Sequence, residues 1–298
     1  MNVSRGIFAL IFCTLFILSY FTNKYVLSIL KFTFPTIFQG WQTSTGALLL
    51  LVTWKLGLVE INGFSRSAAF SQLPGSFLFI GNIYAGSKAL SLLPIPFFFV
   101  LQNVSEVFAF LMIAVTHREK SSWMKLLSVC ILLGSAASLI LYNPSGMFTL
   151  TYITFGPSGY TWASVHLFCV GAYKVFQKNT KTSHLSDLEE QFINYVTRGL
   201  DRGLRFYPPD LIQVPYWVHS QDFNSKNAIL SFCLMLATIK LKNSLSQEHC
   251  GVWCFLAKAL ASGLSLYTFN TVLSPVTLCC VLLNYTGEAL FVYSDRFH

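Results

Sequence analysis

Long apolar runs constrain this chain more than any other feature. Nine runs are visible between short polar connections, at 7–30, 36–58, 73–92, 95–115, 124–142, 159–177, 227–241, 250–272 and 275–294. A helix that crosses a membrane needs about 20 mostly apolar residues. Charged residues make up only 11% of the chain, whereas soluble domains contain about 25%. The sequence therefore predicts an all-α integral membrane protein with many spans, in contact with a lipid bilayer.

Basic residues gather at the ends of the apolar runs. The net charge of +8 can indicate nucleic-acid binding, but residues at run ends form no basic face, so we expect no nucleic-acid partner. Lys and Arg accumulate on the cytosolic side of a membrane. A cytosolic N-terminus places most of them on that side, namely Arg5, Arg66, Arg118, Lys120, Lys125, Lys178 and Lys181. We therefore expect both termini in the cytosol.

The stretch 196–226 does not fit this pattern. It contains seven charged residues and three prolines, and charges and unsatisfied backbone are costly in lipid. We expect it to lie outside the lipid, although Lys178 and Lys240 on either side both favour the cytosol. A ten-span chain would need a seventh span from near Glu190, and the apolar pattern does not supply one. Natural divergence, an alternative exon and an error in the gene model are the open explanations.

Ionisable side chains also occur inside the apolar runs. The stretch 84–106 places Lys88, Asn103 and Glu106 at membrane depth, on either side of a Pro-x-Pro turn. Each charge at the centre of a bilayer costs about 2.5–3.5 kcal/mol on insertion scales. We therefore interpret this stretch as part of the lining of a polar cavity.

Lysines within the apolar runs are the candidate charge contacts for a ligand: Lys24, Lys88, Lys174 and Lys258, accompanied by Glu106 and Glu288. Lys24 and Lys174 lie near run ends, where snorkelling to the headgroups is an equal interpretation. Lys258 lies near mid-span, where snorkelling explains it least. A lysine amine is a compact charge that suits phosphate, so several around one aqueous cavity would neutralise a diphosphate.

Aromatic and amide groups in the same runs suit a nucleobase. Tyr25 and Tyr84 offer aromatic faces for stacking, and Asn103 offers an amide that can read a base edge. The alternative is that Tyr and Trp form belts at the membrane interfaces, an interpretation we prefer for Trp54 and Trp123.

The sequence contains no set of residues typical of an enzyme. It has no nucleophile elbow, Gly-rich phosphate loop or His/carboxylate cluster, and His166 is interpreted as a packing residue. The eight cysteines lack the spacing of metal ligands. We therefore expect no catalysis, no metal and no cofactor.

The order Gly86-Ser-Lys-Ala-Leu, Pro94-Ile-Pro and Gln102-Asn-Val-Ser resembles the third and fourth helices of Golgi nucleotide-sugar transporters. These belong to the drug/metabolite transporter superfamily, and the similarity is strongest to the GDP-mannose carriers. The resemblance implies ten helices in two inverted five-helix repeats, 1–142 and 159–298, joined by a lumenal loop at 143–158, with a degraded seventh span.

Two family motifs can be placed on this chain. The base-reading Phe-Tyr-Asn-Asn of GDP-mannose carriers aligns with Phe192-Ile-Asn-Tyr195, and Gly-Ala-Leu-Asn-Lys aligns with Cys254-Phe-Leu-Ala-Lys258. The phosphate-contacting lysine is kept, whereas the second base-reading Asn is replaced. Lys258 and Asn194 lie on these motifs. With the intramembrane lysines, amide and tyrosines described above, the expected substrate contacts are Lys258, Lys88, Asn194, Asn103, Tyr25, Tyr84 and Lys24.

The expected function follows from this resemblance. We expect a Golgi transporter, with the endoplasmic reticulum as the other compartment, that exchanges cytosolic UDP-N-acetylglucosamine or a related UDP-sugar for lumenal nucleoside monophosphate. GDP-mannose and another phosphorylated metabolite are alternative cargoes. A non-transporting membrane interaction protein, or an inactive isoform, is the alternative of a different class. A homodimer is also compatible with the sequence.

Overall fold

The computed structural model of the chain describes residues 3–30, 35–59, 66–118, 121–141, 159–180, 186–204 and 214–294. All regular structure within these ranges is helical. The helices are α1 (Val3–Lys24), η1 (Tyr25–Ile29), α2 (Pro35–Lys55), α3 (Arg66–Leu92), α4 (Ile95–His117), α5 (Trp123–Leu141), α7 (Gly159–Thr180), α8 (Asp187–Leu204), α9 (Val214–Ser244), α10 (Gln247–Thr268) and α11 (Pro275–Ser294). The expected loop at 143–158 lies outside the described residues.

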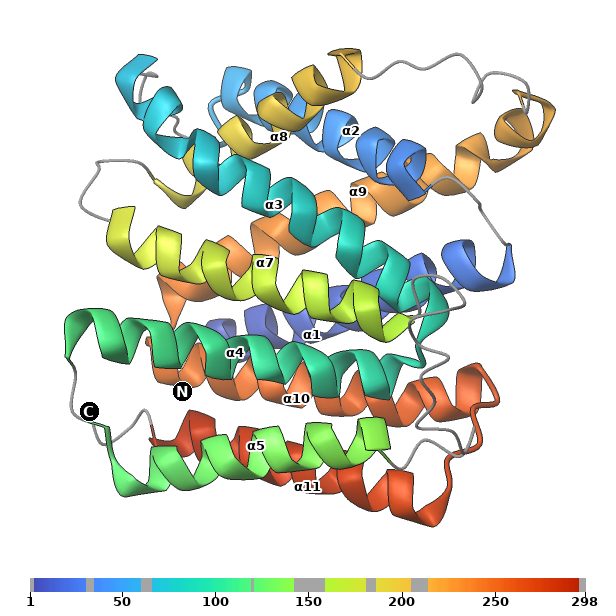
Figure 1. Ribbon diagram of the computed structural model, residues 1–298. Helices are drawn as coiled ribbons and strands as arrows, with labels where there is room; N and C mark the ends of the chain where they lie inside the picture. Colours follow the sequence, from blue (N-terminus) through green and yellow to red (C-terminus); the bar gives the residue numbers. More distant parts are fainter. Residues whose placement is uncertain are drawn as a thin grey trace.

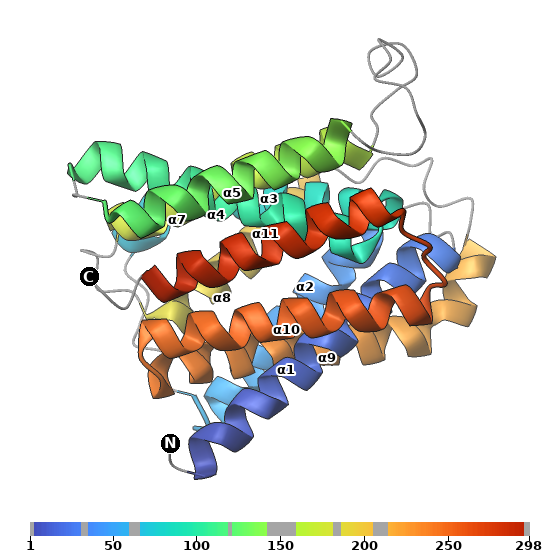
Figure 2. The same cartoon turned by 90° about the horizontal axis from the view of Figure 1, so that it is seen from below.

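The helices form one bundle in which successive α-helices run in alternate directions (Figure 1). The start of α1 and the end of α11 lie at the same end of the bundle, which we call the terminus end (Figures 1 and 2). Lys55 closes α2 at this end, and Lys178 and Lys242 lie in the last turns of α7 and α9. The charge asymmetry that the sequence indicates is therefore also a spatial asymmetry.

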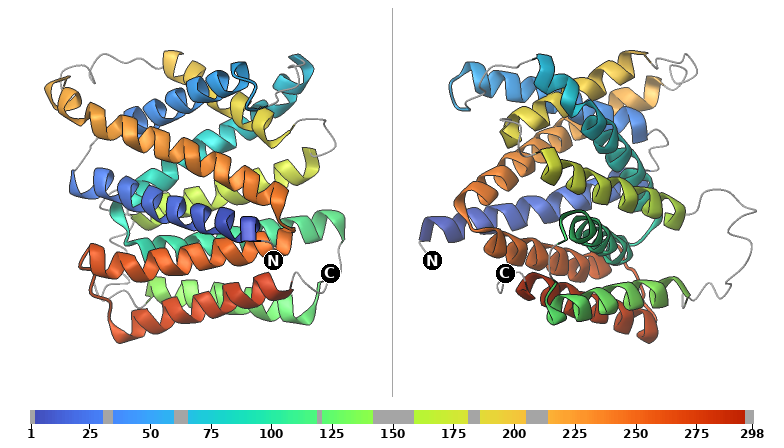
Figure 3. Two further views of the ribbon diagram at one scale, coloured as in Figure 1. Left: turned by 180° about the vertical axis from the view of Figure 1, so that it is seen from behind. Right: turned by 60° about the vertical axis from the view of Figure 1, so that its left-hand side comes forward.

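The bundle combines apolar helices with more polar ones. Within the part of the chain that the structure describes, five helical segments are long and apolar enough to cross a membrane, at Arg5–Ile29, Ile95–Thr116, Trp123–Leu141, His249–Thr268 and Pro275–Ser294. These correspond to α1 with η1, α4, α5, α10 and α11. The more polar helices α2, α3, α8 and α9 gather on the other side of the bundle (Figures 1 and 3). The chain is therefore a multi-span helical membrane protein, in which α3 packs against α7 and α9 packs against α1 and α2.

Close helix contacts fix α7 against α3 and α4. A Cβ atom at Gly171 of α7 would lie 2.2 Å from the ring of Phe108 on α4, and one at Gly86 of α3 would lie 2.7 Å from His166. Phe98 also packs on the imidazole of His166 at a ring distance of 5.1 Å. His166 is buried at this junction, in the packing position that the sequence analysis gives it.

The region around residue 190 differs from the apolar-run prediction. The structure forms α8 from Asp187 to Leu204, near the place where the missing seventh span was expected, and α9 extends the short run at 227–241 to Val214–Ser244. An apolar-run search misses α8 because its helix is strongly amphipathic. Residues 205–213 lie outside the described residues, and the membrane position of 196–226 stays a prediction.

Candidate functional site

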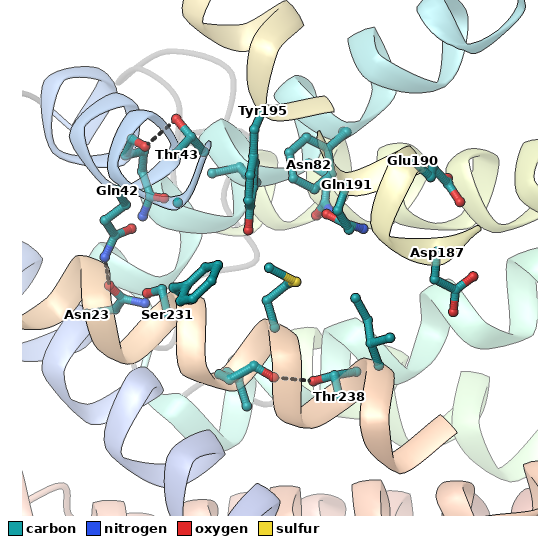
Figure 4. A pocket seen from close by; sticks show the side chains of 18 of the residues that line it. Asn23, Gln42, Thr43, Asn82, Asp187, Glu190, Gln191, Tyr195, Ser231 and Thr238 are labelled. Atoms are coloured by element: carbon teal, nitrogen blue, oxygen red, sulfur yellow. Dashed lines mark hydrogen bonds between the residues drawn. The ribbon is translucent and has the colours of Figure 1, made fainter. Parts of the chain in front are cut away.

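A cavity of about 480 Å³ lies among the more polar helices (Figure 4). Its lining comes from α1, α2, α3, α7, α8 and α9, and includes Asn23, Gln39, Gln42, Thr43, Gly46, Phe79, Asn82, Gln177, Asp187, Glu190, Gln191, Tyr195, Ser231, Phe232, Met235, Thr238 and Lys242. Amides, hydroxyls and aromatic rings dominate this surface. Such a surface suits a polar organic ligand that carries ring systems.

Tyr195 occupies a central position in this cavity. Its ring points from α8 into the middle of the space, with Gln191 and Asn82 on one side of it and Gln42 on the other (Figure 4). The ring fits against α2 because residue 46 is glycine, where an added Cβ atom would lie 3.0 Å from the ring. The cavity therefore presents an aromatic platform with amide groups on either side.

Three amides join the helices α1, α2 and α9 at one side of the cavity. Asn23 Oδ1 accepts hydrogen bonds from Gln42 Nε2 at 3.2 Å and from Asn227 Nδ2 at 3.0 Å. We call these three residues the amide triad. Asn23 and Gln42 line the cavity directly.

The cavity reaches solvent at the terminus end of the bundle. Lys242 of α9 and Asp187 of α8 line it there, with 3.9 Å between Nζ and Oδ2. Their side chains are 52% and 40% exposed, so this ion pair is weak and screened. Among the lining residues that the structure describes, Lys242 is the one basic side chain.

Polar bonds attach α8 to its neighbours beside the cavity, and two of the bonded residues, Gln177 and Glu190, also line it. Glu190 Oε1 accepts hydrogen bonds from Tyr173 Oη at 2.7 Å, Gln177 Nε2 at 2.8 Å and Gln72 Nε2 at 3.1 Å. Asn194 Nδ2 donates to the same Tyr173 hydroxyl at 2.7 Å. These bonds hold α8 in register against α3 and α7.

Asn194 therefore lies outside the cavity lining. Its side chain is fully buried, and its Oδ1 accepts a hydrogen bond of 2.8 Å from Ser76 of α3. The neighbouring Tyr195 faces the cavity instead. Asn194 and Tyr195 align with the two base-reading asparagines of the GDP-mannose motif. Tyr195, which differs from the motif, is the residue that lines the cavity.

Lys258 belongs to a second polar cluster, buried among α4, α5, α10 and α11. Its Nζ donates to Glu288 Oε1 at 2.6 Å and to Asn103 Oδ1 at 2.7 Å. Asn103 Nδ2 donates in turn to Glu288 Oε2 at 2.8 Å and to Asn284 Oδ1 at 3.0 Å. Asn284 Nδ2 then reaches Ser135 Oγ at 2.8 Å. Lys258 and Asn103 are thus brought together as neighbours, away from the cavity lining.

A third charged pair lies next to this cluster. Lys174 of α7 forms an ion pair with Glu106 of α4, and the same helix carries Asn103, which accepts from Lys258. Two lysines and two glutamates therefore form a balanced group at membrane depth. The ion pair also gives Lys174 a partner within the protein, so snorkelling does not describe its position here.

The other predicted contacts are distributed along the bundle. Lys24 Nζ donates to the carbonyl oxygens of Leu90 and Leu93 at 2.8 Å, at the turn between α3 and α4. Tyr84 packs edge-on against Trp162 at 5.3 Å. Lys88 is half-buried on α3 and Tyr25 is exposed at the start of η1. None of these side chains lines the cavity of Figure 4.

The sequence analysis missed most of the cavity residues. Tyr195 carried the clearest signal, because it replaces an asparagine in the aligned base-reading motif. Glu190 and Gln191 lay in the region where no span was expected. Asn23 and Gln42 were visible as amides within apolar runs, but their mutual contact depends on how α1 packs against α2.

These features define a class: a multi-span helical membrane protein with an internal polar cavity that reaches one end of its bundle. No protein-family model matches the chain. A solved crystal structure of 12% sequence identity superposes with a TM-score of 0.55 and covers all of both chains, which agrees with the fold alone.

Curated relatives identify the family. The chain is 48% identical to the UDP-N-acetylglucosamine transporter TMEM241 homolog of Xenopus laevis, over 96% of each chain. It is 42% identical to the UDP-N-acetylglucosamine transporter TMEM241 of Mus musculus, over 99% of each. GDP-mannose transporter 1 of Cryptococcus neoformans is 27% identical over 61% of this chain and 51% of its own length. The chain belongs to the TMEM241 family of nucleotide-sugar transporters. These relatives are transporters, which confirms the expectation of a protein that is not an enzyme.

Proposed function

We propose that this protein carries UDP-N-acetylglucosamine across the Golgi membrane in exchange for lumenal uridine monophosphate. The observation that carries the proposal is the cavity centred on Tyr195, in a chain 42–48% identical over nearly its full length to proteins named for this cargo. Aromatic rings stack on bases of any identity, so Tyr195 provides a platform for uracil without the paired asparagines of the GDP-mannose motif.

The proposed orientation puts the terminus end in the cytosol. Basic residues concentrate there, as they do on cytosolic faces, and the cavity reaches solvent at the same end. The arrangement then corresponds to a state that accepts cytosolic cargo. Ten crossings in two inverted repeats would place both termini on this side, and the alternating helix directions of Figure 1 support that topology.

Lys258 remains our proposed contact for the diphosphate, with Lys88 of α3 as a second proposed contact. In the present arrangement, the amine of Lys258 donates hydrogen bonds to Glu288 and Asn103. Phosphate oxygens would take the place of Glu288 when the cargo moves deeper into the bundle. Lys242, which lines the cavity at the terminus end, would meet the diphosphate first.

The proposal is tested by thermal unfolding of the purified protein with UDP-, GDP- and CMP-sugars. UDP-N-acetylglucosamine and uridine monophosphate should raise the midpoint most, since a ligand that binds only the folded state stabilises it by RT ln(1 + [L]/Kd). A larger shift with GDP-mannose would contradict the proposed cargo. No shift with any nucleotide would favour a membrane interaction protein that does not transport.

We also propose a homodimer. Its mass in detergent, measured on the same purified preparation, would detect it.

A further inference from the structure

The amide triad of Asn23, Gln42 and Asn227 has more hydrogen-bonding groups than it uses. Asn23 Oδ1 accepts both internal bonds, whereas Gln42 Oε1 and Asn23 Nδ2 form none within the described residues. Asn227 is 1% exposed, and its Oδ1 is buried without a partner in the described part of the chain. Buried polar groups are nearly always satisfied by protein, water or ligand, so this triad is incomplete as it stands.

The two free groups that face the cavity form a complementary pair. Gln42 offers a carbonyl oxygen as acceptor and Asn23 offers an N–H donor, and both side chains border the open space in Figure 4. An acetamide group presents one N–H donor and one carbonyl acceptor. Gln42 Oε1 can accept a hydrogen bond from such an N–H, and Asn23 Nδ2 can donate one to such a carbonyl.

The cavity contains a second set of amides beside its aromatic platform. Gln191 lies about one helical turn before Tyr195 on α8, and Asn82 faces it from α3 (Figure 4). A base stacked on Tyr195 would present its edge to this set. The base would then occupy this side of the cavity. The sugar, which is the other uncharged end of the cargo, would contact the amide triad on α1, α2 and α9.

We propose that the amide triad reads the N-acetyl group of the sugar, with Gln42 Oε1 accepting from the acetamide N–H and Asn23 Nδ2 donating to its carbonyl. This inference rests on the proposed function and names the part of the cargo that each residue reads. It makes Asn23 and Gln42 specificity-determining residues. A site built to hydrogen-bond a ligand group discriminates strongly against the analogue that lacks it, because its own polar groups are then left unpaired.

The test compares three ligands on the purified protein: uridine monophosphate, UDP-glucose and UDP-N-acetylglucosamine. UDP-glucose differs from UDP-N-acetylglucosamine only at C2, where a hydroxyl replaces the acetamide. The parent should bind UDP-N-acetylglucosamine about tenfold more tightly than UDP-glucose, which corresponds to one well-formed pair of hydrogen bonds. Gln42→Met should bring this ratio close to one and leave the affinity for uridine monophosphate unchanged.

Two further variants keep the test decisive. Asn23→Asp retains the oxygen that accepts from Gln42 and Asn227 but loses the free donor, so it should also reduce the ratio even if Gln42→Met fails to fold. Gln191→Met, in the other amide set, should weaken all three ligands alike and preserve the ratio. An unchanged ratio in both triad variants would overturn the inference, as would an equal loss of uridine monophosphate in Gln42→Met. If the parent bound none of the three ligands, the proposed function itself would fail.

Discussion

Lys258 on α10 donates a hydrogen bond of 2.6 Å to Glu288 on α11, and both residues are buried among four helices. Neither partner can be ionised alone at this depth without a large desolvation cost. The same pair supplies the cation that we assign to the diphosphate. Stability and transport are therefore coupled at this position, and a single substitution changes both.

We predict that Lys258→Ala lowers the free energy of unfolding by about 3–5 kcal/mol, because Glu288 is left as an uncompensated buried charge. Lys258→Met combined with Glu288→Met removes both charges, so it should recover most of that loss. Thermal unfolding measures this comparison. Uptake by the double variant should nevertheless stay absent in proteoliposomes, since the charge contact to the diphosphate is gone. Normal uptake by the folded double variant would make Lys258 a structural residue only.

A second prediction concerns the base. Tyr195→Asn restores the Asn-Asn pair of the GDP-mannose motif, and it should raise competition by GDP-mannose about tenfold relative to UDP-N-acetylglucosamine, the equivalent of roughly one hydrogen bond. Tyr195→Phe keeps the ring and should preserve the parent's preference. Competition for labelled UDP-N-acetylglucosamine uptake measures both variants. Identical competition profiles for parent, Phe and Asn variants would exclude Tyr195 from base recognition.

A third prediction concerns topology. Asn243 at the end of α9 and Asn270 after α10 are both exposed, at opposite ends of the bundle. In a background without native cysteines, Asn243→Cys should react with a membrane-impermeant maleimide from the cytosolic side of sealed vesicles, and Asn270→Cys should react only after permeabilisation. The reversed pattern would invert the orientation that the basic residues indicate.

A fourth prediction concerns whether Lys24 stabilises the fold or contacts the substrate. Its amine is held by the backbone carbonyls of Leu90, Ser91 and Leu93, at the end of the bundle opposite the cavity mouth. Lys24→Met should lower the free energy of unfolding by about 1–3 kcal/mol, since buried carbonyls lose their donor. Nucleotide affinity measured by thermal shift should change less than twofold. A larger loss of affinity at normal stability would restore Lys24 as a substrate contact, as the sequence analysis expected.

The sequence was sufficient for the membrane class and for the apolar helices, because lipid-facing helices must be apolar along most of their length. It was insufficient for α8. That helix faces α2 and α3 with one side and the cavity with another, so its polar residues reduce the apolar signal on which span detection depends.

Intramembrane polarity alone selected Asn103 and Lys258. The two residues are in contact, and their roles as substrate contacts stay predictions. The balancing role of Glu288, however, depends on how α10 packs against α11. Asn194 and Tyr195 are adjacent in sequence but point in different directions, since an α-helix has about 3.6 residues per turn. The rotation of α8 about its axis decides which one meets a ligand.

Exchange in proteoliposomes tests the central claim most directly. Vesicles that contain the purified protein would be loaded with uridine monophosphate, and the uptake of external labelled UDP-N-acetylglucosamine would be followed over time. We predict saturable uptake that requires internal uridine monophosphate, exceeds GDP-mannose uptake, and is absent with the folded Lys258→Met/Glu288→Met variant. Uptake that is independent of the internal nucleotide, or no uptake by a protein that still binds uridine monophosphate, would contradict the account.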